Sequence, residues 1–377
     1  MENEKMNYLG KDIPKLGFGL MRLPMLDGEI DLEQTKTMVD KFLAAGFTYF
    51  DTAYIYNNGK SEEAAKIALV DRYPREKFQF ATKLPAWAGA KNADEAKRMF
   101  FTSLERTGAG YFDYYLLHNC GAERTKMFDD FGLWDFLLEQ RDKGLVKHAG
   151  FSFHDTADVL DDILAKHPEM EFVQLQINYA DWNSPTVQSR KCFEVAKKHQ
   201  KPVIIMEPVK GGLLAKATPP IAKILGEVNP HASPSSWALR FAASLDNVIT
   251  VLSGMSTVGQ MEDNLATMAD FRPLATAEYA AIEKVRDALA AVENIPCTKC
   301  NYCAKDCPQH IPIPGIFDAM NQYLVFDSLE IAKRAYEFCT QRDPSASQCA
   351  ECGQCESVCP QHIGIMRELK RVAATFE

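Results

Sequence analysis

Two identical cysteine patterns near the C-terminal end constrain this 377-residue chain more than any other feature of its sequence. Each has the spacing C-x₂-C-x₂-C-x₃-C followed at once by proline, a spacing that wraps a [4Fe–4S] cluster. In proteins with two such patterns, the fourth cysteine of each ligates the other cluster. The predicted ligands are therefore Cys297, Cys300, Cys303 and Cys359 for one cluster, and Cys349, Cys352, Cys355 and Cys307 for the second.

Zinc and disulfides are the alternative uses of these cysteines. Zinc sites typically use pairs of C-x₂₋₄-C and not four cysteines with a trailing proline. Disulfides conflict with a cytoplasmic location, which we expect because the charged start Met1-Glu-Asn-Glu-Lys is followed by no apolar run. The segment between the two patterns looks helical, so we expect residues 293–377 to form an α-helical ferredoxin-like domain with two [4Fe–4S] clusters.

Eight short β-rich runs alternate with helical stretches in the preceding part of the chain. The runs are Leu16–Leu20, Phe47–Asp51, Phe78–Leu84, Asp113–His118, His148–Phe153, Phe172–Asn178, Pro202–Pro208 and Asn247–Gly254. Mostly continuous apolar runs separated by helices indicate parallel strands covered by helices. Eight such units predict a (β/α)₈ TIM barrel over residues 1–292. An open doubly wound sheet is the alternative, and Gly17-Phe-Gly19 is too short for its glycine-rich turn.

Helix ends and overall charge add three further expectations. Asp31 is expected to cap a helix over Asp31–Ala45, and Ser184 with Pro185 to begin the helix over Thr186–His199. The formal net charge of −9 gives no indication of a nucleic-acid partner. Since no stretch approaches the roughly 18 apolar residues of a membrane span, we expect no membrane partner either.

Three ionisable residues stand at the ends of three successive runs. Asp51 ends the second run, Lys83 the third and His118 the fourth. Barrel enzymes build their active sites from these strand ends, and buried Asp and Lys are rare unless paired. Taken singly, each has a structural explanation, such as a buried ion pair or a core histidine. Together they predict a catalytic site.

These segments resemble the aldo-keto reductase superfamily, and with the cysteine region the whole chain resembles its ferredoxin-fused branch. The resemblance implies a catalytic tetrad of Asp51, Tyr56, Lys83 and His118, with Tyr54 as the competitor for the role of Tyr56. A phenol is a poor acid at neutral pH, so we expect Lys83 to lower the pKa of Tyr56. Asp51 would hold Lys83 charged, and His118 would donate to the carbonyl oxygen of the substrate.

The resemblance also implies sites for NAD(P)H. Ser152 and Gln176 match two residues that hold the nicotinamide, whereas Phe153 stands where the family usually has Asn, and Met206 or Glu207 where it often stacks a Tyr. The chain offers no Arg or Lys for a 2′-phosphate in the loop after the eighth run, which weakens the preference for NADP over NAD. The remaining cofactor-binding residues that we expect are Pro208, Lys210, Gly211, Gly212 and Leu213 at the pyrophosphate, and Gly254, Ser256, Gln260 and Asn264 at the adenosine.

The favoured interpretation is an iron–sulfur oxidoreductase that reduces a small-molecule carbonyl with NAD(P)H. The clusters would then serve electron transfer or the docking of a redox partner, such as a ferredoxin or a flavoprotein. Hydride carries two electrons and each cluster passes one, so a flavin or a substrate radical is an alternative link. An electron-transfer or redox-sensing protein on a non-catalytic barrel is the rival interpretation. The substrate and the oligomeric state cannot be predicted.

Overall fold

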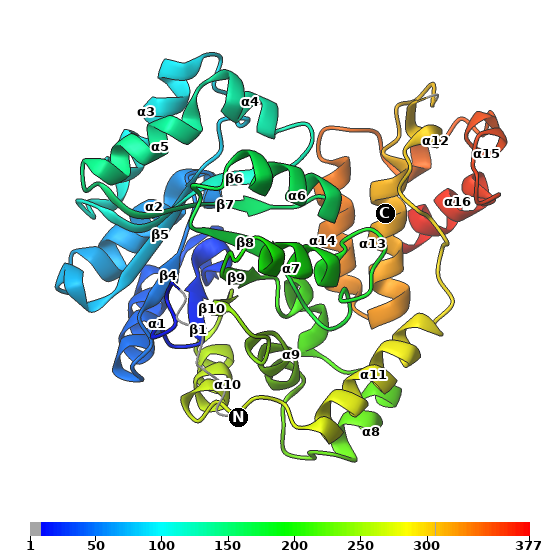
Figure 1. Cartoon of the computed structure of the whole chain (residues 1–377). Coiled ribbons are helices and arrows are strands. Elements are labelled where there is room, and N and C mark those ends of the chain that lie inside the picture. The colour runs from blue at the N-terminus through cyan, green and yellow to red at the C-terminus, as the bar shows by residue number, and fades with distance from the viewer. Residues whose placement is uncertain (1–8, 306) are drawn as a thin grey trace. The chain divides into compact units, whose positions relative to one another are not determined.

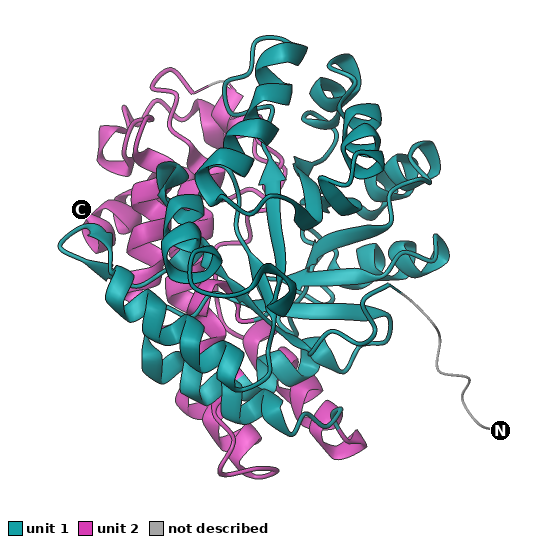
Figure 2. Ribbon diagram, turned by 90° about the vertical axis from the view of Figure 1, so that its left-hand side faces the viewer, with its two compact units in different colours: residues 1–208, 236–274 teal, residues 209–235, 275–377 magenta. Residues whose placement is uncertain are grey.

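The computed structural model describes residues 9–305 and 307–377. The chain divides into two compact units (Figure 2). Unit 1 comprises residues 1–208 and 236–274, and unit 2 comprises residues 209–235 and 275–377. Unit 2 thus includes the cysteine-rich region together with an excursion of the chain after residue 208. The predicted boundary between residues 292 and 293 stays a prediction.

Eight parallel strands form a closed barrel in unit 1, in the order β1-β10-β9-β8-β7-β6-β5-β4 (Figure 1). The predicted (β/α)₈ barrel is therefore confirmed, and the open sheet is wrong. β1 closes the barrel by pairing with both β4 and β10. The strands are β1 Leu16–Gly19, β4 Tyr49–Asp51, β5 Gln79–Leu84, β6 Phe112–Cys120, β7 Val146–Phe153, β8 Phe172–Gln176, β9 Val203–Met206 and β10 Val248–Ser253.

Helices follow the barrel strands, and a small antiparallel pair, β2 Met25–Leu26 and β3 Glu29–Ile30, follows β1. The α-helices up to residue 274, apart from α8, are α1 Leu32–Ala44, α2 Lys60–Ala65, α3 Ala93–Thr107, α4 Thr125–Asp130, α5 Leu133–Asp142, α6 Ala157–Lys166, α7 Ser189–Lys198, α9 Pro234–Ala243 and α10 Val258–Ala269. Short single-turn segments are η1 Leu20–Arg22, η2 Tyr56–Gly59, η3 Lys66–Val70 and η4 Arg75–Lys77.

The two predicted helix starts have opposite outcomes. Asp31 caps α1, because its carboxylate accepts a hydrogen bond from the Gln34 amide at 2.9 Å. The predicted start at Ser184 is wrong, since α7 begins only at Ser189. The Ser184 amide instead donates to the Asp181 carbonyl at 3.0 Å, so Ser184 closes a turn before the helix. A capping residue and a proline serve a turn as well as a helix start.

Aromatic and aliphatic side chains fill the barrel interior. Tyr114 lies at its centre, with ring centroids 5.2 Å from both Tyr49 and Phe172. Close approach of β7 and β8 requires glycine at position 150, because a Cβ there would lie 2.5 Å from the Phe172 carbonyl oxygen. The other buried members of this cluster are Ala81, Leu116, Ile204, Ile249 and Leu252.

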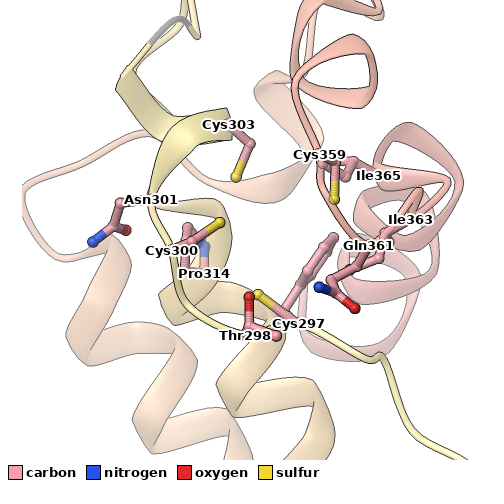
Figure 3. A pocket seen from close by; sticks show the side chains of 11 residues that line it. Cys297, Thr298, Cys300, Asn301, Cys303, Pro314, Cys359, Gln361, Ile363 and Ile365 are labelled. Carbon is pink, nitrogen blue, oxygen red and sulfur yellow. The ribbon is translucent and has the colours of Figure 1, made fainter. Parts of the chain in front are cut away.

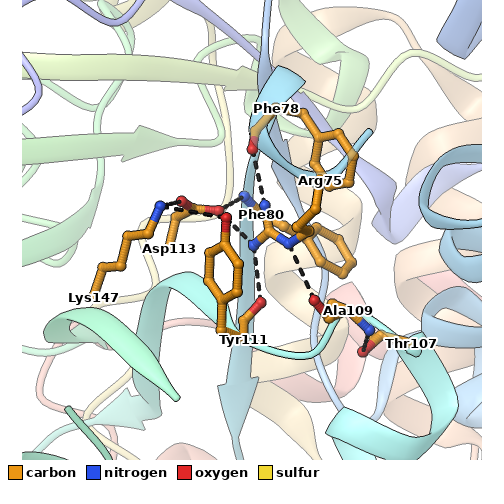
Figure 4. A network of polar contacts seen from close by, with 8 residues as sticks. All are labelled: Arg75, Phe78, Phe80, Thr107, Ala109, Tyr111, Asp113 and Lys147. Atoms are coloured by element: carbon orange, nitrogen blue, oxygen red, sulfur yellow. Dashed lines mark hydrogen bonds and ion pairs between the residues drawn. The ribbon is translucent and has the colours of Figure 1, made fainter. Parts of the chain in front are cut away.

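A polar network joins the N-terminal ends of β5, β6 and β7 (Figure 4). The Asp113 carboxylate on β6 accepts from Arg75 at 2.6 Å, from the Phe80 amide on β5 at 2.9 Å and from Lys147 on β7 at 2.8 Å. Arg75 also donates to the Tyr111 carbonyl at 2.8 Å and lies over the Tyr111 ring. Side chains at this face of a barrel serve stability.

Unit 2 is helical around its own apolar core. Helix α8 packs against α11, and α13 packs against α14 and α16. Ile316, Phe317 and Met320 on α13 are buried together with Leu369 and Val372 on α16. The elements are η5 Lys210–Ala215, α8 Pro219–Gly226, α11 Thr276–Ala290, α12 Tyr302–Lys305, α13 Ile313–Phe326, α14 Leu329–Thr340, η6 Ala346–Gln348, α15 Gln354–Ser357 and α16 Ile365–Phe376.

None of the helices in the described residues combines the length and the apolar character of a membrane span.

Candidate functional site

A buried lysine organises the C-terminal ends of β4 and β5. The Lys83 ammonium lies 2.5 Å from Asp51 Oδ1 and donates to the Thr52 carbonyl at 2.7 Å. Its third neighbour is the Tyr56 hydroxyl at 3.2 Å. Gln174 on β8 donates to the other carboxylate oxygen of Asp51 at 3.1 Å. The structure therefore brings Asp51, Lys83 and Tyr56 together, as the sequence predicts.

The loop after β4 positions Tyr56 rather than Tyr54 at this lysine. Asn57, Asn58 and Gly59 have φ angles of 49°, 57° and 90°, so the chain turns sharply after Tyr56. Glycine suits position 59 because a φ of 90° lies in the left-handed region that other residues rarely adopt. Arg106 covers the Tyr54 ring, with its Cζ 4.4 Å from the ring centroid. The side chain of Tyr54 therefore packs against Arg106 and not against the Lys83 ammonium.

His118 projects from an irregularity in β6. The pairing of β6 with β7 shifts between Leu117 and Cys120, and Asn119 has a φ of 62°. Such a bulge redirects a side chain. The His118 ring lies edge-on to Tyr56, with centroids 5.8 Å apart. Trp87 supports it from the loop after β5, where the indole Nε1 donates to the His118 carbonyl at 2.6 Å.

Burial and charge set the protonation states of these groups. Burial alone would lower the pKa of Lys83, but Asp51 and Tyr56 raise it above its ordinary value, so the ammonium stays charged. Burial lowers the pKa of His118 well below 6.5, helped by the Lys83 charge, so its ring is neutral. Burial raises the pKa of Tyr56, and Lys83 only partly opposes this rise. Lys83 thus lowers the pKa of Tyr56 as expected, but burial raises it by more, so the net shift is upward.

Two predicted nicotinamide residues lie at the ends of β7 and β8. The Ser152 hydroxyl oxygen accepts from the Asn119 amide at 2.7 Å, which ties it to the bulge of β6. Gln176 donates weakly to Asp181 at 3.4 Å. Asn119 Oδ1 is buried and has no hydrogen-bond partner within the described residues. Phe153, at the position where an amide was expected, is buried.

The loop after β10 uses most of its predicted side chains internally. Gln260 Oε1 accepts from the Ser256 amide at 2.7 Å, and Asn264 donates to Ser253 at 2.7 Å from a buried position. The Ser256 hydroxyl donates to the Arg22 carbonyl at 2.7 Å. A Cβ on Gly254 would lie 3.5 Å from Arg22 Cβ and Cδ, so the aliphatic part of this side chain from η1 lies beside the loop. Arg22 forms an ion pair with Glu207 at 3.4 Å.

The remaining predicted cofactor residues lie where unit 1 ends and unit 2 begins. Pro208 is the last residue of this part of unit 1, and Lys210–Leu213 form most of η5 in unit 2. Lys210, Gly211 and Gly212 have φ angles of 49°, 65° and 101°. Within unit 2, η5 packs against α13 and α14, and a Cβ on Gly212 would lie 3.4 Å from Ile331.

Four of the eight patterned cysteines line one pocket in unit 2. They are the first three of the first pattern and the last of the second: Cys297, Cys300, Cys303 and Cys359. Figure 3 shows their sulfur atoms facing a common space. The rest of the lining is largely apolar and includes Phe317, Ile363 and Ile365. These are the four cysteines that the sequence predicts for one cluster, and their role as ligands stays a prediction.

Three of the other four cysteines, Cys355, Cys349 and Cys307, lie close enough to influence one another. The pKa of Cys355 is raised to about 11, chiefly by burial and in smaller part by neighbours that include the thiols of Cys349 and Cys307. The pKa of Cys303 is likewise raised to about 11, chiefly by burial, and Cys355 is among the thiols that contribute. The two sets are therefore neighbours, and α12 packs against α15. None of the eleven cysteines, all of which lie in the described residues, forms a disulfide.

The cysteines surround their sites instead of converging on one point. Within the part of the chain that the structure describes, no three His, Cys, Asp or Glu side chains lie close enough to hold a single metal ion. A [4Fe–4S] cluster needs four separated thiolates. The donor set and the apolar lining fit such a cluster.

The sequence analysis missed three residues at the barrel site. They are Gln174, Asn119 and Arg22, and each contacts a residue that is distant in the sequence. None of the three belongs to a recognisable motif. The strand-end position of Asn119, directly after His118, is the one signal that could have revealed it.

Residues 15–287 match the model of the aldo/keto reductase family, and residues 296–363 match that of a 4Fe-4S dicluster domain. An aldo-keto reductase of Mycolicibacterium smegmatis is 32% identical over 143 residues, which are 38% of this chain and 47% of that protein. Among solved structures, aldo-keto reductase AKR11C1 of Bacillus halodurans has a TM-score of 0.61 at 24% identity, covering 74% of this chain and 96% of its own. An aldo-keto reductase of Klebsiella pneumoniae in complex with NADPH has a TM-score of 0.57 at 19% identity, covering 73% and 91%.

Proposed function

The chain belongs to the aldo/keto reductase family and carries a 4Fe-4S dicluster domain, and we propose that it reduces the carbonyl group of a small molecule with NAD(P)H. The observation that carries this proposal is the Lys83 ammonium placed between Asp51 and the Tyr56 hydroxyl, at 2.5 and 3.2 Å. A structural ion pair needs no phenol at its third donor position. A carbonyl-reducing site does, because the reduced oxygen must receive a proton.

Each residue has a separate task in the proposed reaction. Tyr56 gives its proton to the substrate oxygen, and the charged Lys83 stabilises the phenolate that remains. Asp51 compensates the burial of Lys83, and Gln174 orients Asp51. His118, neutral because of its lowered pKa, donates a hydrogen bond to the same oxygen as negative charge develops there. The raised pKa of Tyr56 keeps it protonated, which suits an acid that acts in the reductive direction.

The residues at the ends of β6, β7 and β8 fit a nicotinamide carboxamide. NAD(P)H, when bound, supplies the hydride. Ser152 and Gln176 would hold the carboxamide oxygen and nitrogen, and the unpartnered Asn119 Oδ1 would accept from the amide in place of the missing residue at Phe153. Consecutive positive φ angles in η5 expose amides suited to phosphate, with Lys210 adding charge. We propose that the adenosine end of the cofactor binds to the loop after β10, through Gly254, Ser256, Gln260 and Asn264.

The clusters form the second part of the proposal. We assign one [4Fe–4S] cluster to Cys297, Cys300, Cys303 and Cys359, and one to Cys349, Cys352, Cys355 and Cys307. Cys300 and Cys352 are exposed, whereas Cys303 and Cys355 are buried and near each other. This arrangement supports electron transfer between the clusters and exchange with a redox partner from solvent.

Substitution of Tyr56 tests the reductase proposal. Tyr56→Phe removes the proton donor and keeps the ring, so we expect kcat to fall roughly 100- to 10,000-fold. The measurement is carbonyl-dependent oxidation of NADPH and NADH by the anaerobically purified holoprotein. Tyr54→Phe is the matched control, since Tyr54 lies under Arg106, and it should retain activity within about threefold. Equal turnover by the wild type and Tyr56→Phe would reject Tyr56 as the acid.

A further inference from the structure

An exposed arginine stands on a rigid loop that follows β6. Arg124 immediately precedes α4. Asp155 fixes the loop, since its Oδ2 accepts from the Ala122 amide at 2.8 Å. Thr125 Oγ1 accepts from the Gly121 amide at 3.1 Å. Gly121 is packed so closely that a Cβ would lie 2.9 Å from the Asp155 carboxylate. The backbone that carries Arg124 is therefore held from both sides.

A series of tilted and edge-on ring contacts connects Arg124 to the proposed acid. The Arg124 Cζ lies 5.0 Å from the centroid of the Trp87 ring. The Trp87 and His118 rings are 5.8 Å apart, and the His118 and Tyr56 rings are also 5.8 Å apart. Trp87 is itself anchored by its hydrogen bond to the His118 carbonyl. Arg124 thus lies one aromatic ring away from the residue that would hold the substrate oxygen.

The positive charge of Arg124 has no carboxylate partner. Within residues 9–305 and 307–377, its guanidinium makes no hydrogen bond and no ion pair, and its recorded contact is with Trp87. Glu207, which directly follows β9 and raises the pKa of Tyr56, is instead paired with Arg22. After burial and Lys83, the charges of His154 and Arg124 lower the pKa of His118 further, so the field of Arg124 extends to the proposed site.

We propose that Arg124 binds a carboxylate of the substrate, which makes the substrate class carbonyl compounds that carry a carboxylate. This inference rests on the proposed reductase function. A guanidinium binds a carboxylate through two parallel hydrogen bonds, and the contact with the Trp87 ring restrains where the Arg124 guanidinium lies. Hydride adds to the carbonyl carbon and the Tyr56 proton to its oxygen, while the carboxylate is held unchanged. Arg124 is therefore a specificity residue.

Two matched aldehydes test the assignment. We expect Arg124→Gln to lower kcat/KM for 4-carboxybenzaldehyde roughly 10- to 100-fold, the range for a lost charge-assisted hydrogen bond, and to change that for benzaldehyde by less than about twofold. Arg124→Lys keeps the charge and loses the paired geometry, so it should recover part of the loss. Arg98→Gln, an exposed arginine on α3, is the matched control and should leave both values unchanged. Equal losses for the two aldehydes, or none, would overturn the assignment.

A binding measurement separates this inference from the reductase proposal. Calorimetry with 4-(hydroxymethyl)benzoate and with benzyl alcohol requires no turnover. We expect the carboxylate to bind the wild-type holoprotein roughly tenfold or more tightly than it binds Arg124→Gln, and benzyl alcohol to show no such difference. Arg124-dependent binding without reduction of either aldehyde would reject the reductase proposal alone. Binding that is indifferent to Arg124 would reject the carboxylate site, whatever the turnover.

Discussion

Two buried tyrosines in the barrel illustrate how single residues determine the pH range over which the folded state is stable. Burial raises the pKa of Tyr49 and of Tyr115 well above the ordinary value of 10.0. The hydroxyl oxygen of Tyr49 is buried without a hydrogen-bond partner in the described residues, and that of Tyr115 is buried beside Ser103. In the unfolded chain these phenols ionise near pH 10, so above that pH the unfolded state releases protons that the folded state retains. Stability must therefore fall as the pH rises.

Replacing Tyr49 should weaken this alkaline loss. Each phenol with a raised pKa contributes up to about 1.4 kcal/mol per pH unit above pH 10, and Tyr49→Phe removes one of them without changing the ring. We expect the free energy of urea unfolding to decline less between about pH 8 and pH 11 in Tyr49→Phe than in the wild type. Tyr279→Phe, at an exposed residue of α11, is the control. Parallel declines in all three proteins would contradict the argument.

Residue-level prediction from the sequence succeeded where position along a strand was decisive. Asp51 and Lys83 could be predicted because each is an ionisable residue at the end of an apolar run. Gln174 could not, since its bond to Asp51 joins residues on β8 and β4 across the barrel. The lowering of the Tyr56 pKa by Lys83 could be predicted from the neighbouring charge, but the larger rise caused by burial could not, because the degree of burial depends on the folded structure.

At the scale of elements, the bonds of Asp113 hold three strands in register. Its side chain is only 7% exposed, and it receives bonds from residues before or within β5 and β7. Removing one partner of a buried ion pair leaves the other charge uncompensated. This network lies at the N-terminal end of the strands, so it should affect stability without affecting the chemistry.

We expect Asp113→Ala to lower the free energy of unfolding by about 3–5 kcal/mol, because Arg75 loses its buried counter-charge. Lys147→Ala is the comparison on the same carboxylate. Its side chain is 52% exposed, so its loss should cost about 1 kcal/mol or less. Urea unfolding measures both, and kcat/KM of the folded protein should match that of the wild type. If Asp113→Ala changed the free energy of unfolding only slightly, the bonds of Asp113 would not be needed to hold the strands in register.

Elements were predicted well where periodicity was long, and less well at their ends. All eight barrel strands lie within the predicted runs or overlap them, because continuous apolar runs between helices have few alternatives. The bulge at His118 and Asn119 was not predictable, since it depends on pairing with β7. The start of α7 was misplaced because Ser184 and Pro185 form a turn instead.

At the scale of the whole molecule, the proposed exchange of fourth cysteines makes the two cysteine patterns mutually dependent. Neither pattern can complete its cluster alone, so the region from Cys297 to Cys359 must fold as one body. Double substitutions test this connectivity. If Cys300 and Cys359 serve one cluster, Cys300→Ser with Cys359→Ser should lose about four irons, as either single substitution does. Cys352→Ser with Cys359→Ser should lose about eight.

Iron and acid-labile sulfide measured on anaerobically purified protein provide the comparison. Cys339→Ser is the control, because this half-buried cysteine belongs to neither pattern. The reverse outcome, with the Cys300 and Cys359 pair losing everything and the Cys352 and Cys359 pair losing half, would mean that each pattern keeps its own fourth cysteine.

The loop η5 limits where the protein can be truncated or its two parts exchanged with those of other proteins. It lies within the sequence of the barrel, directly after β9, yet it groups with the cysteine-rich helices and lies beside Ile331 on α14. A truncation after residue 292 would strip this loop of its neighbours, and a cysteine-rich fragment grafted elsewhere would lack the loop. The barrel and the cysteine-rich region therefore cannot be exchanged independently. A recombination that separated them would require new residues to cover the surface around Gly212.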